Sequence, residues 1–355
     1  QTYEWGLFQK AYTGREVFYL IGSVGDEWRV VAQVFVRRWP WIPLANYEVS
    51  CGPIFLTVED YAEALRYLDQ WAAPKAVRFD VGPRWPLEHF ERLSQINRSL
   101  GFEPTSDPHT AIYSEETALV DLRPPAVDIL KSFRYTTRYE IRRAQSNGVV
   151  VRFANDARGM EAFFPLFLDQ KIHQEKYHPE KRFFDTLFEC FLHNPRNGVI
   201  ALSLKGDKLL AAAIYYRLGK KCIYRYGASD LASKKEGDTS HLMHWQAMQY
   251  FKNRGCEWYD FCGASPSLPR DYPTWGVNLF KIGFSKHFER STPDFSKSYR
   301  SLMGSALRWR GALSAAGHWF ARWRLSRASR KPRQGTATPG DVVASFHSEQ
   351  NLPLY

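Results

Sequence analysis

The feature that most constrains the fold of this chain is the order in which strand-like and helix-like segments alternate. Residues 16–21 and 28–37 are rich in β-branched and aromatic residues and flank a Gly-containing turn, which predicts two adjacent strands. Residues 57–71 carry apolar residues at helical spacing, and Thr57 with Asp60 three residues later is typical of a helix N-terminus. The order in the first third is therefore β-β-α-β-α-β, with the remaining elements being a strand at 76–80, a helix at 85–100 and a strand at 110–121.

A second series of comparable segments follows. It begins with a predicted helix at 128–147 and a strand at 149–153. The later elements are helices at 159–173, 182–193 and 240–254 and strands at 199–204, 209–218, 221–226 and 258–262. No residue-level repeat relates the two series. A length of 355 residues exceeds that of one ordinary domain, so two similar α+β units built around mixed sheets are the economical prediction.

The last part of the chain differs from the rest in charge. Between residues 295 and 340 there are ten Lys and Arg and no Asp or Glu, so ten of the eleven net positive charges lie there. Apolar residues at steps of three and four predict a basic amphipathic helix at 295–326. The polar sequence at 327–355 predicts a flexible tail. The segment 295–333 suits peripheral contact with an anionic membrane, and packing of the helix on the first domain is the alternative.

Composition and motif searches exclude several classes of protein. With 44% hydrophobic residues the chain is not a disordered protein, and no run approaches the ~18 apolar residues of a membrane span. Five cysteines without a CxxC pair predict buried, reduced thiols and a cytoplasmic protein. The motifs GxxxxGK[ST], GxGxxG, GxSxG and HExxH are all missing from the sequence. His241 and His244 are three residues apart on a predicted helix and could face one metal ion. No further His or carboxylate is an evident third ligand, so we expect no metal site.

Five segments occur in the order in which one known family carries its motifs. They read QTYEWGLFQK at 1–10, CGP at 51–53, TTRYEIRRA at 136–144 with GV at 148–149, IYRYGAS at 223–229, and YDFCG at 259–263 with LFKIGF at 279–284. Together they resemble the FemABX family, bacterial aminoacyltransferases that use aminoacyl-tRNA to build the cross-bridge of peptidoglycan. The departures are Gln9 where the family has Lys, Cys262 where it has Gly, and a closer spacing at 181–184.

The resemblance implies an α+β fold of two tandem GNAT-like domains, with mixed β-sheets flanked by helices and no coiled-coil arm. On this basis the first domain is expected at 1–147 and the second at 148–294, with the substrate groove in and between them. The implied reaction moves an amino acid from aminoacyl-tRNA to an amine of a peptidoglycan precursor stem peptide, either UDP-linked or lipid-linked. The aminoacyl-tRNA is a co-substrate, and no cofactor is implied.

The ester of aminoacyl-tRNA is already activated, so the implied reaction needs no covalent nucleophile. Alignment of the amine with the ester supplies ~7–11 kcal/mol, and stabilisation of the oxyanion remains for the enzyme. Lys281 lies in an apolar run between Phe280 and Ile282 and is the candidate electrostatic catalyst, because a buried ammonium acts more strongly than one in water. A solvated Lys is the alternative. Asp260 is the candidate acceptor of the amine proton, or else a cap within its own loop.

Aromatic residues near these two positions are candidates for binding the acceptor. Tyr224 and Tyr226 alternate along a predicted strand, so both phenols are expected on one side of it, where a pair of hydroxyls suits acceptor binding. Packing against a helix with only the hydroxyls exposed is the alternative. Phe280, beside Lys281, is assigned to substrate binding as well.

Basic residues elsewhere are candidates for binding phosphate groups. Lys10 and Arg182 together match the pyrophosphate of a nucleotide-sugar or lipid-linked acceptor. Arg138 lies on a basic helix that suits tRNA or acceptor phosphates, although a solvated basic face explains it equally well.

Other functions remain open at the level of sequence. A CoA-dependent GNAT N-acyltransferase requires a pyrophosphate loop of the form [QR]xxGx[GA], and the nearest text, at 145–150, fails at the last position. Aminoacyl transfer to an exopolysaccharide or a peptide natural product is a further alternative, as is a non-catalytic RNA- or membrane-binding adaptor. The sequence does not specify the amino acid, the tRNA or the oligomeric state. We expect a cytoplasmic protein with peripheral contact at the inner face of the membrane.

Overall fold

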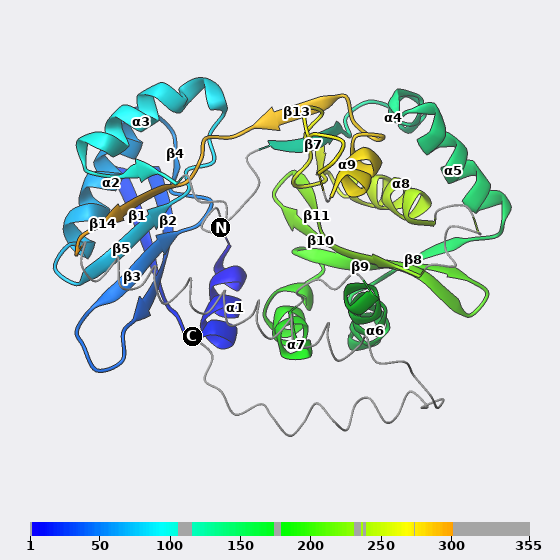
Figure 1. Cartoon of the computed structure of the whole chain (residues 1–355), viewed down its shortest axis with the longest axis horizontal. Coiled ribbons are helices and arrows are strands. Elements are labelled where there is room, and N and C mark those ends of the chain that lie inside the picture. The colour runs from blue at the N-terminus through cyan, green and yellow to red at the C-terminus, as the bar shows by residue number, and fades with distance from the viewer. Residues whose placement is uncertain are drawn as a thin grey trace. The chain divides into compact units, whose positions relative to one another are not determined.

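The computed structural model describes residues 2–105, 116–173, 179–230, 236, 239–272 and 274–300 (Figure 1). Residues 1–299 form one compact unit. The prediction that a helix begins at residue 295 is wrong, because residues 295–298 form a strand that pairs with strands of the first half of the chain. The rest of the predicted helix, from residue 301 to 326, and the predicted tail at 327–355 lie outside the described residues. Within the described ranges, no helix has the length and apolar character that a membrane span requires.

The first sheet contains seven strands in the order β1-β2-β3-β5-β14-β6, with β4 paired to β2. The strands are β1 (Glu16–Val24), β2 (Glu27–Arg38), β3 (Ala45–Val49), β4 (Ile54–Phe55), β5 (Ala76–Val81), β6 (Glu103–Pro104) and β14 (Phe295–Ser298). The helices packed on it are α2 (Val58–Ala72) and α3 (Phe90–Ser99), the latter preceded by a 3-10 turn at Leu87–His89. Tyr61, Leu65 and Leu68 of α2 are fully buried in the core that helices and sheet share.

The strongest local signals of the first half are confirmed. The predicted strand pair is β1 and β2, which run antiparallel. The predicted helix at 57–71 is α2, where Thr57 Oγ1 accepts the backbone N–H of Asp60 at 3.2 Å and Asp60 Oδ2 accepts that of Thr57 at 2.9 Å. This reciprocal arrangement satisfies two N–H groups that a helix N-terminus otherwise leaves without partners.

The second sheet also contains seven strands, in the order β13-β7-β12-β11-β10-β9-β8. They are β7 (Glu116–Asp121), β8 (Val150–Ala154), β9 (Gly198–Lys205), β10 (Lys208–Leu218), β11 (Lys221–Ser229), β12 (Trp258–Asp260) and β13 (His287–Arg290). Its helices are α4 (Ala126–Ser132), α5 (Tyr135–Ser146), α6 (Ala157–His173), α7 (Lys181–Leu187) with a π-helical turn at Phe188–Leu192, α8 (Thr239–Lys252) and α9 (Trp275–Lys281). The fold is therefore α+β, with two mixed sheets.

Helices cover both faces of the second sheet. Along β10, alternate residues enter different cores: Ala213 and Tyr215 join the core beneath α5 and α8, whereas Ile214 and Tyr216 join the core beneath α6 and α7 (Figure 1). This alternation follows from the two-residue period of a strand. A central strand buried on both faces explains why the sequence of β10 reads as a nearly continuous apolar run.

The two sheets exchange strands across the domain boundary expected at residues 147 and 148. Strand β7, from the first half of the sequence, pairs with β12 and β13 in the second sheet. Strand β14, which follows the expected second domain, pairs with β5 and β6 in the first sheet. Each sheet thus needs one strand from the other half of the chain, so neither half completes its sheet alone.

The single helix predicted at 128–147 is wrong, because the chain there forms two helices, α4 and α5. Phe133 adopts an extended conformation between them, with φ −67° and ψ 154°. Its ring packs 5.2 Å from that of Phe284 and 5.7 Å from that of Trp245, and the N–H of Arg134 donates to the carbonyl of Gly283 at 2.9 Å. These contacts with distant residues stabilise a break that helical periodicity does not reveal.

Helix α1 (Tyr3–Thr13) begins the chain and joins the two halves. Its Phe8 is fully buried in the core of α6 and α7, with its ring 5.1 Å from that of Phe183. On the other side, Gln33 Nε2 of β2 donates to the carbonyl of Thr2 at 2.9 Å. A Cβ atom at Gly6 would lie 2.2 Å from the hydroxyl of Tyr19 and 2.7 Å from Nε2 of Gln33, so a larger residue here would displace both side chains.

Candidate active site

The parallel strands β11 and β12 separate partway along their length. Their last register pair is Ile223 with Asp260. Beyond that pair, β11 continues to Ser229 and stays paired with β10. The chain after β12 instead forms a hydrogen bond with β7, in which the N–H of Phe261 donates to the carbonyl of Ala118 at 3.0 Å. Among the described residues no backbone hydrogen bond joins β11 to the chain beyond this point. An extended substrate can therefore align along this edge of β11.

A β-bulge at Arg225 lies immediately past the point of separation. On β10, Tyr215 is opposite Tyr224 and Ile214 is opposite Tyr226, which leaves Arg225 as the extra residue. The bulge interrupts the alternation of side chains along β11. The expectation that Tyr224 and Tyr226 face the same side of the strand is consequently wrong.

The two tyrosines enter different cores of the second sheet. The ring of Tyr224 lies 4.5 Å from that of His244, and burial raises the pKa of Tyr224 to about 12. The ring of Tyr226 lies 5.3 Å from that of Phe184 and 6.1 Å from that of Phe167, and burial raises its pKa too. Both phenols therefore keep their protons at neutral pH, but they cannot hold one acceptor group as a pair.

Asp260 organises the turn that follows β12. Its Oδ1 accepts the backbone N–H of Cys262 at 2.7 Å and the hydroxyl of Thr117, and Lys221 Nζ lies 3.9 Å from Oδ2. Cys262 has φ +52°, a left-handed conformation that favours glycine. These contacts correspond to the capping role that the sequence left open as the alternative to proton acceptance.

Lys281 is held at the same turn, at the end of α9. Its Nζ donates to the carbonyls of Cys262 at 2.8 Å and Gly263 at 3.0 Å. An ammonium group has three N–H donors, so these two bonds leave one for a substrate oxygen. Burial lowers the pKa of Lys281, Arg225 lowers it further, and the nearby carboxylate of Asp260 opposes this. The structure thus brings Lys281, Asp260 and Arg225 together at the separation of β11 and β12.

Phe280 and His244 pack behind Lys281. The ring of Phe280 lies 4.7 Å from that of His241 and 5.3 Å from those of His244 and Phe284, so it contributes to the core under the site. His244 is buried, and its Nδ1 lies 3.1 Å from the hydroxyl of Tyr215 and in hydrogen-bonding contact with that of Tyr259. Burial holds the pKa of His244 well below its usual value, so this histidine is neutral.

No sequence pattern indicates the arrangement around His244, because its hydrogen-bond partners come from two separate strands. The sequence does contain one signal for the bulge at Arg225. Gly227 is an isolated glycine within a strand pattern, which is typical of a bulge or a close approach. A Cβ atom at Gly227 would lie 2.1 Å from the hydroxyl of Tyr224. Within the described residues, no group of His, Cys, Asp and Glu is placed to hold a metal ion.

Lys10 and Arg182 are placed on neighbouring helices. Helix α1 packs against α7 through the ring of Tyr12, which lies 5.1 Å from that of Phe183. Both Lys10 and Arg182 are exposed, whereas the adjacent Lys181 is paired with Asp185 at 2.7 Å. The two side chains predicted to bind phosphates therefore come from helices that are in contact, although one lies near the start of the chain and the other near its middle.

Arg138 has a structural role in the second half. Its Nη1 donates to the carbonyls of Lys131 at 2.9 Å and Phe133 at 2.5 Å, at the end of α4. The guanidinium thus satisfies carbonyls that the helix C-terminus leaves without intrahelical partners. Binding of a phosphate by the same side chain stays a prediction.

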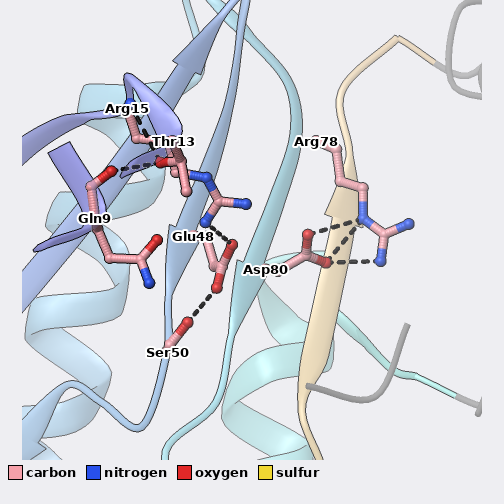
Figure 2. A network of polar contacts seen from close by, with 7 residues as sticks. All are labelled: Gln9, Thr13, Arg15, Glu48, Ser50, Arg78 and Asp80. Carbon is pink, nitrogen blue, oxygen red and sulfur yellow. Dashed lines mark hydrogen bonds and ion pairs between the residues drawn. The ribbon is translucent and has the colours of Figure 1, made fainter. Parts of the chain in front are cut away.

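In the first sheet, the parallel strands β3 and β5 carry charged side chains that are paired with one another or with nearby residues (Figure 2). Arg15 Nη1 donates to Glu48 Oε2 at 2.7 Å, and the hydroxyl of Ser50 donates to the other oxygen of Glu48. On the neighbouring parallel strand, Arg78 Nε donates to Asp80 at 2.8 Å. Burial raises the pKa of Asp80, while Arg78 opposes that shift. Each carboxylate here has a positive partner within the protein.

Comparisons with known proteins identify the fold. A family model described as an acetyltransferase (GNAT) domain matches residues 131–272. The crystal structure of FemX is similar over 86% of this chain and 93% of FemX, with 18% sequence identity and a TM-score of 0.76. This chain has the FemX fold. A C-terminal domain (DUF2156) assigned to a lysylphosphatidylglycerol synthetase from Agrobacterium fabrum is similar over 81% of this chain and 88% of that domain, at 14% identity and a TM-score of 0.50. No curated protein sequence matches this chain.

The FemX fold confirms the fold that the resemblance to the FemABX family implied. The chain has an acyltransferase-type architecture with a GNAT-like domain, and mixed sheets are flanked by helices. The GNAT match includes β11, β12 and the turn at Cys262, and so contains the place where the two strands separate. All five cysteines are free. Cys222 and Cys256 are buried as predicted, whereas Cys190 and Cys262 are only partly buried and Cys51 is exposed, so the prediction of buried thiols is wrong for these three.

Proposed function

We propose that this chain is an aminoacyltransferase that moves an amino acid from aminoacyl-tRNA to an amine of a peptidoglycan precursor stem peptide. The observation that carries the proposal is the ammonium group of Lys281, held by two carbonyls where β11 and β12 separate. The FemX fold supports it, as do the five motif segments in their family order.

The chemistry requires one bond to form and one to break. The acceptor amine attacks the carbonyl carbon of the ester, and the carbonyl oxygen gains negative charge. The third N–H of Lys281 donates to that oxygen, which stabilises the tetrahedral intermediate. The bond to the ribose oxygen of the tRNA then breaks, and the proton lost by the amine ends on that oxygen. No covalent enzyme intermediate is needed, because the ester is already activated.

In this proposal the acceptor is held by one group outside the GNAT match, Lys10, and by one group within it, Arg182. Lys10 and Arg182 bind the phosphates of a UDP-linked or lipid-linked precursor, since both are exposed on helices that touch one another. We place the reaction in the cytoplasm, where aminoacyl-tRNA is available and free thiols stay reduced.

The proposal is tested by incubating the full chain with a mixture of charged tRNAs and UDP-linked pentapeptide precursor. We expect a product heavier by the mass of one amino acid residue, detected by mass spectrometry. Hydrolysing the tRNA ester beforehand with mild base should remove the product. No mass change with any charged tRNA, for both the UDP-linked and the lipid-linked precursor, contradicts the proposal.

The match to a GNAT domain favours one second candidate, a CoA-dependent N-acyltransferase. The text nearest to a pyrophosphate loop, at 145–150, lies at the turn between α5 and β8. Strand β8 is at the opposite edge of the sheet from β13, and three strands separate it from β12. This location does not suit a cofactor bound where β11 and β12 separate. Calorimetry with acetyl-CoA should therefore show no binding, and a stoichiometric binding isotherm would favour the second candidate instead.

A further inference from the structure

The connection between β2 and β3 exposes two large apolar residues at its tip. Residues 39–44 read WPWIPL, and the side chain of Trp41 is 101% exposed while that of Ile42 is 38% exposed. The loop is nevertheless fixed by backbone hydrogen bonds, because Trp39 N–H donates to the carbonyl of Leu44 at 2.8 Å and Leu44 N–H donates to that of Ile42 at 2.8 Å. In Figure 1 this hairpin projects from the end of the first sheet.

The backbone at Trp41 is itself unfavourable for such a residue. Its φ is +70°, the left-handed region in which a bulky side chain is a genuine outlier. A strained tryptophan that buries none of its surface gains nothing from the fold of this unit. Large apolar side chains that are exposed in a fixed conformation indicate a binding surface for a membrane or for another molecule.

The end of the sheet that carries this hairpin is positively charged. Residues 35–47 contain Arg37 and Arg38 and no Asp or Glu, and the turn before β5 adds Lys75, whose carbonyl accepts the N–H of Ala45 at 2.8 Å. Glu16 pairs with Arg38 and also interacts with Lys75, so this one carboxylate offsets only part of the positive charge that Arg37, Arg38 and Lys75 carry.

A pocket of about 250 Å³ opens beside the base of the hairpin. Phe18, Tyr47 and Trp71 provide its apolar wall, and Arg38 and Lys75 lie at it too. Apolar and cationic groups thus meet over one end of the sheet, as they do in proteins that sit at the boundary between lipid head groups and acyl chains.

We propose that the β2–β3 hairpin is a membrane-interface anchor, in which Trp41 and Ile42 enter the head-group region of an anionic bilayer while Arg37 and Lys75 contact lipid phosphates. A small, projecting tip fits a deformable lipid surface better than it fits a protein, whose interface requires a broad complementary area. The anchor is distinct from the basic helix predicted near the C-terminus and does not depend on the proposed reaction. It would, however, bring the enzyme to a lipid-linked acceptor.

The test uses the full chain and vesicles, without any substrate. Wild type and the double variant Trp41→Asp/Ile42→Asp are sedimented with vesicles of phosphatidylcholine containing 30% phosphatidylglycerol. The matched control is Trp28→Asp, because Trp28 is 67% exposed at the opposite end of β2. All three proteins keep residues 301–355, so any difference between them reports on the sheet alone.

We expect the partition coefficient of the double variant to fall at least tenfold, while Trp28→Asp binds as wild type does. Arg37→Glu/Lys75→Glu should weaken binding to anionic vesicles and leave the weaker binding to pure phosphatidylcholine unchanged, which separates the charge contribution from the apolar one. Unchanged circular dichroism confirms folding of these surface variants. Equal vesicle binding by wild type and the double variant, or no vesicle binding by wild type, would overturn the proposal. In the latter case a protein partner would have to cover the hairpin.

Discussion

The parallel strand pair of the first sheet stays closed, whereas that of the second sheet opens. In the first sheet, β3 and β5 pair as far as Val49 and Val81, and hydrogen bonds continue beyond them. Gly82 N–H donates to the carbonyl of Val49 at 3.0 Å, and Gly52 N–H donates to that of Gly82 at 2.7 Å. In the second sheet, β11 and β12 stop pairing at Asp260. Similar local topology therefore yields one closed and one open end.

The difference lies in which groups satisfy the backbone. At the closed end the strands satisfy each other, and a Cβ atom at Gly82 would lie 2.5 Å from Asp294 Oδ1, so there is no room for a larger residue. At the open end the carboxylate of Asp260 caps the N–H of Cys262, and Lys281 binds the carbonyl of Cys262. Side chains thus replace the missing strand partner. The opened half is where we expect chemistry, and the closed half is expected to supply stability.

The largest expected effect comes from removing the charge at the open end. Lys281→Met should lower kcat by about 10²–10³-fold, because the oxyanion loses a charged donor in a partly buried site. The measurement is the rate of aminoacyl transfer to the precursor in single turnover. Lys286→Met is the control, since Lys286 is an exposed lysine five residues later. If a folded Lys281→Met variant turns over at the wild-type rate, Lys281 has no part in the mechanism. The open end of the second sheet would then not be the active site.

A smaller effect is expected from disturbing the closed end. Gly82→Ala should reduce the free energy of unfolding by about 1–3 kcal/mol, because the added methyl group overpacks against the carboxylate of Asp294. The transfer rate should change little. Urea unfolding is the measurement, and Gly22→Ala in the same sheet is the control, since its Cβ would meet only ordinary contacts with Val30 at 3.5 Å. A loss of activity without a loss of stability would place substrate at the closed end instead.

Local patterns predicted the elements that local interactions stabilise. The capping residues and apolar spacing of α2 are contained within about fifteen consecutive residues, and the helix forms where they predict it. The break at Phe133 depends on Trp245 and Phe284, more than a hundred residues away, and no nearby residue signals it. The exchange of β7 and β14 between sheets is likewise determined by pairing between distant segments.

The sequence allowed individual residues of the candidate site to be predicted, but it did not allow their arrangement in space to be predicted. Family motifs pointed to Lys281 and Asp260, and the structure brings these two together. The alternation rule placed Tyr224 and Tyr226 on one face and failed, because one extra residue at Arg225 reverses the direction of every side chain that follows. A bulge depends on the register with a neighbouring strand, which the sequence of a single strand does not contain.

The smallest expected effect concerns the helix that crosses between the parallel strands of the closed half. Thr57→Ala should cost about 1 kcal/mol of stability, because α2 loses its N-cap hydroxyl, while Thr57→Ser should retain most of that stability. The hydrogen bond from Thr57, with further contributions from Arg29, lowers the pKa of Asp60 in the folded protein. A carboxyl whose pKa is lower in the folded state contributes stability above its unfolded pKa and loses it as pH falls through the folded pKa. The difference between wild type and Thr57→Ala in urea unfolding should therefore narrow in acid. If the stability difference between wild type and Thr57→Ala does not depend on pH, the hydroxyl caps the helix without lowering the pKa of Asp60. If Thr57→Ala also lowers the transfer rate, the first sheet contributes to activity as well as to stability.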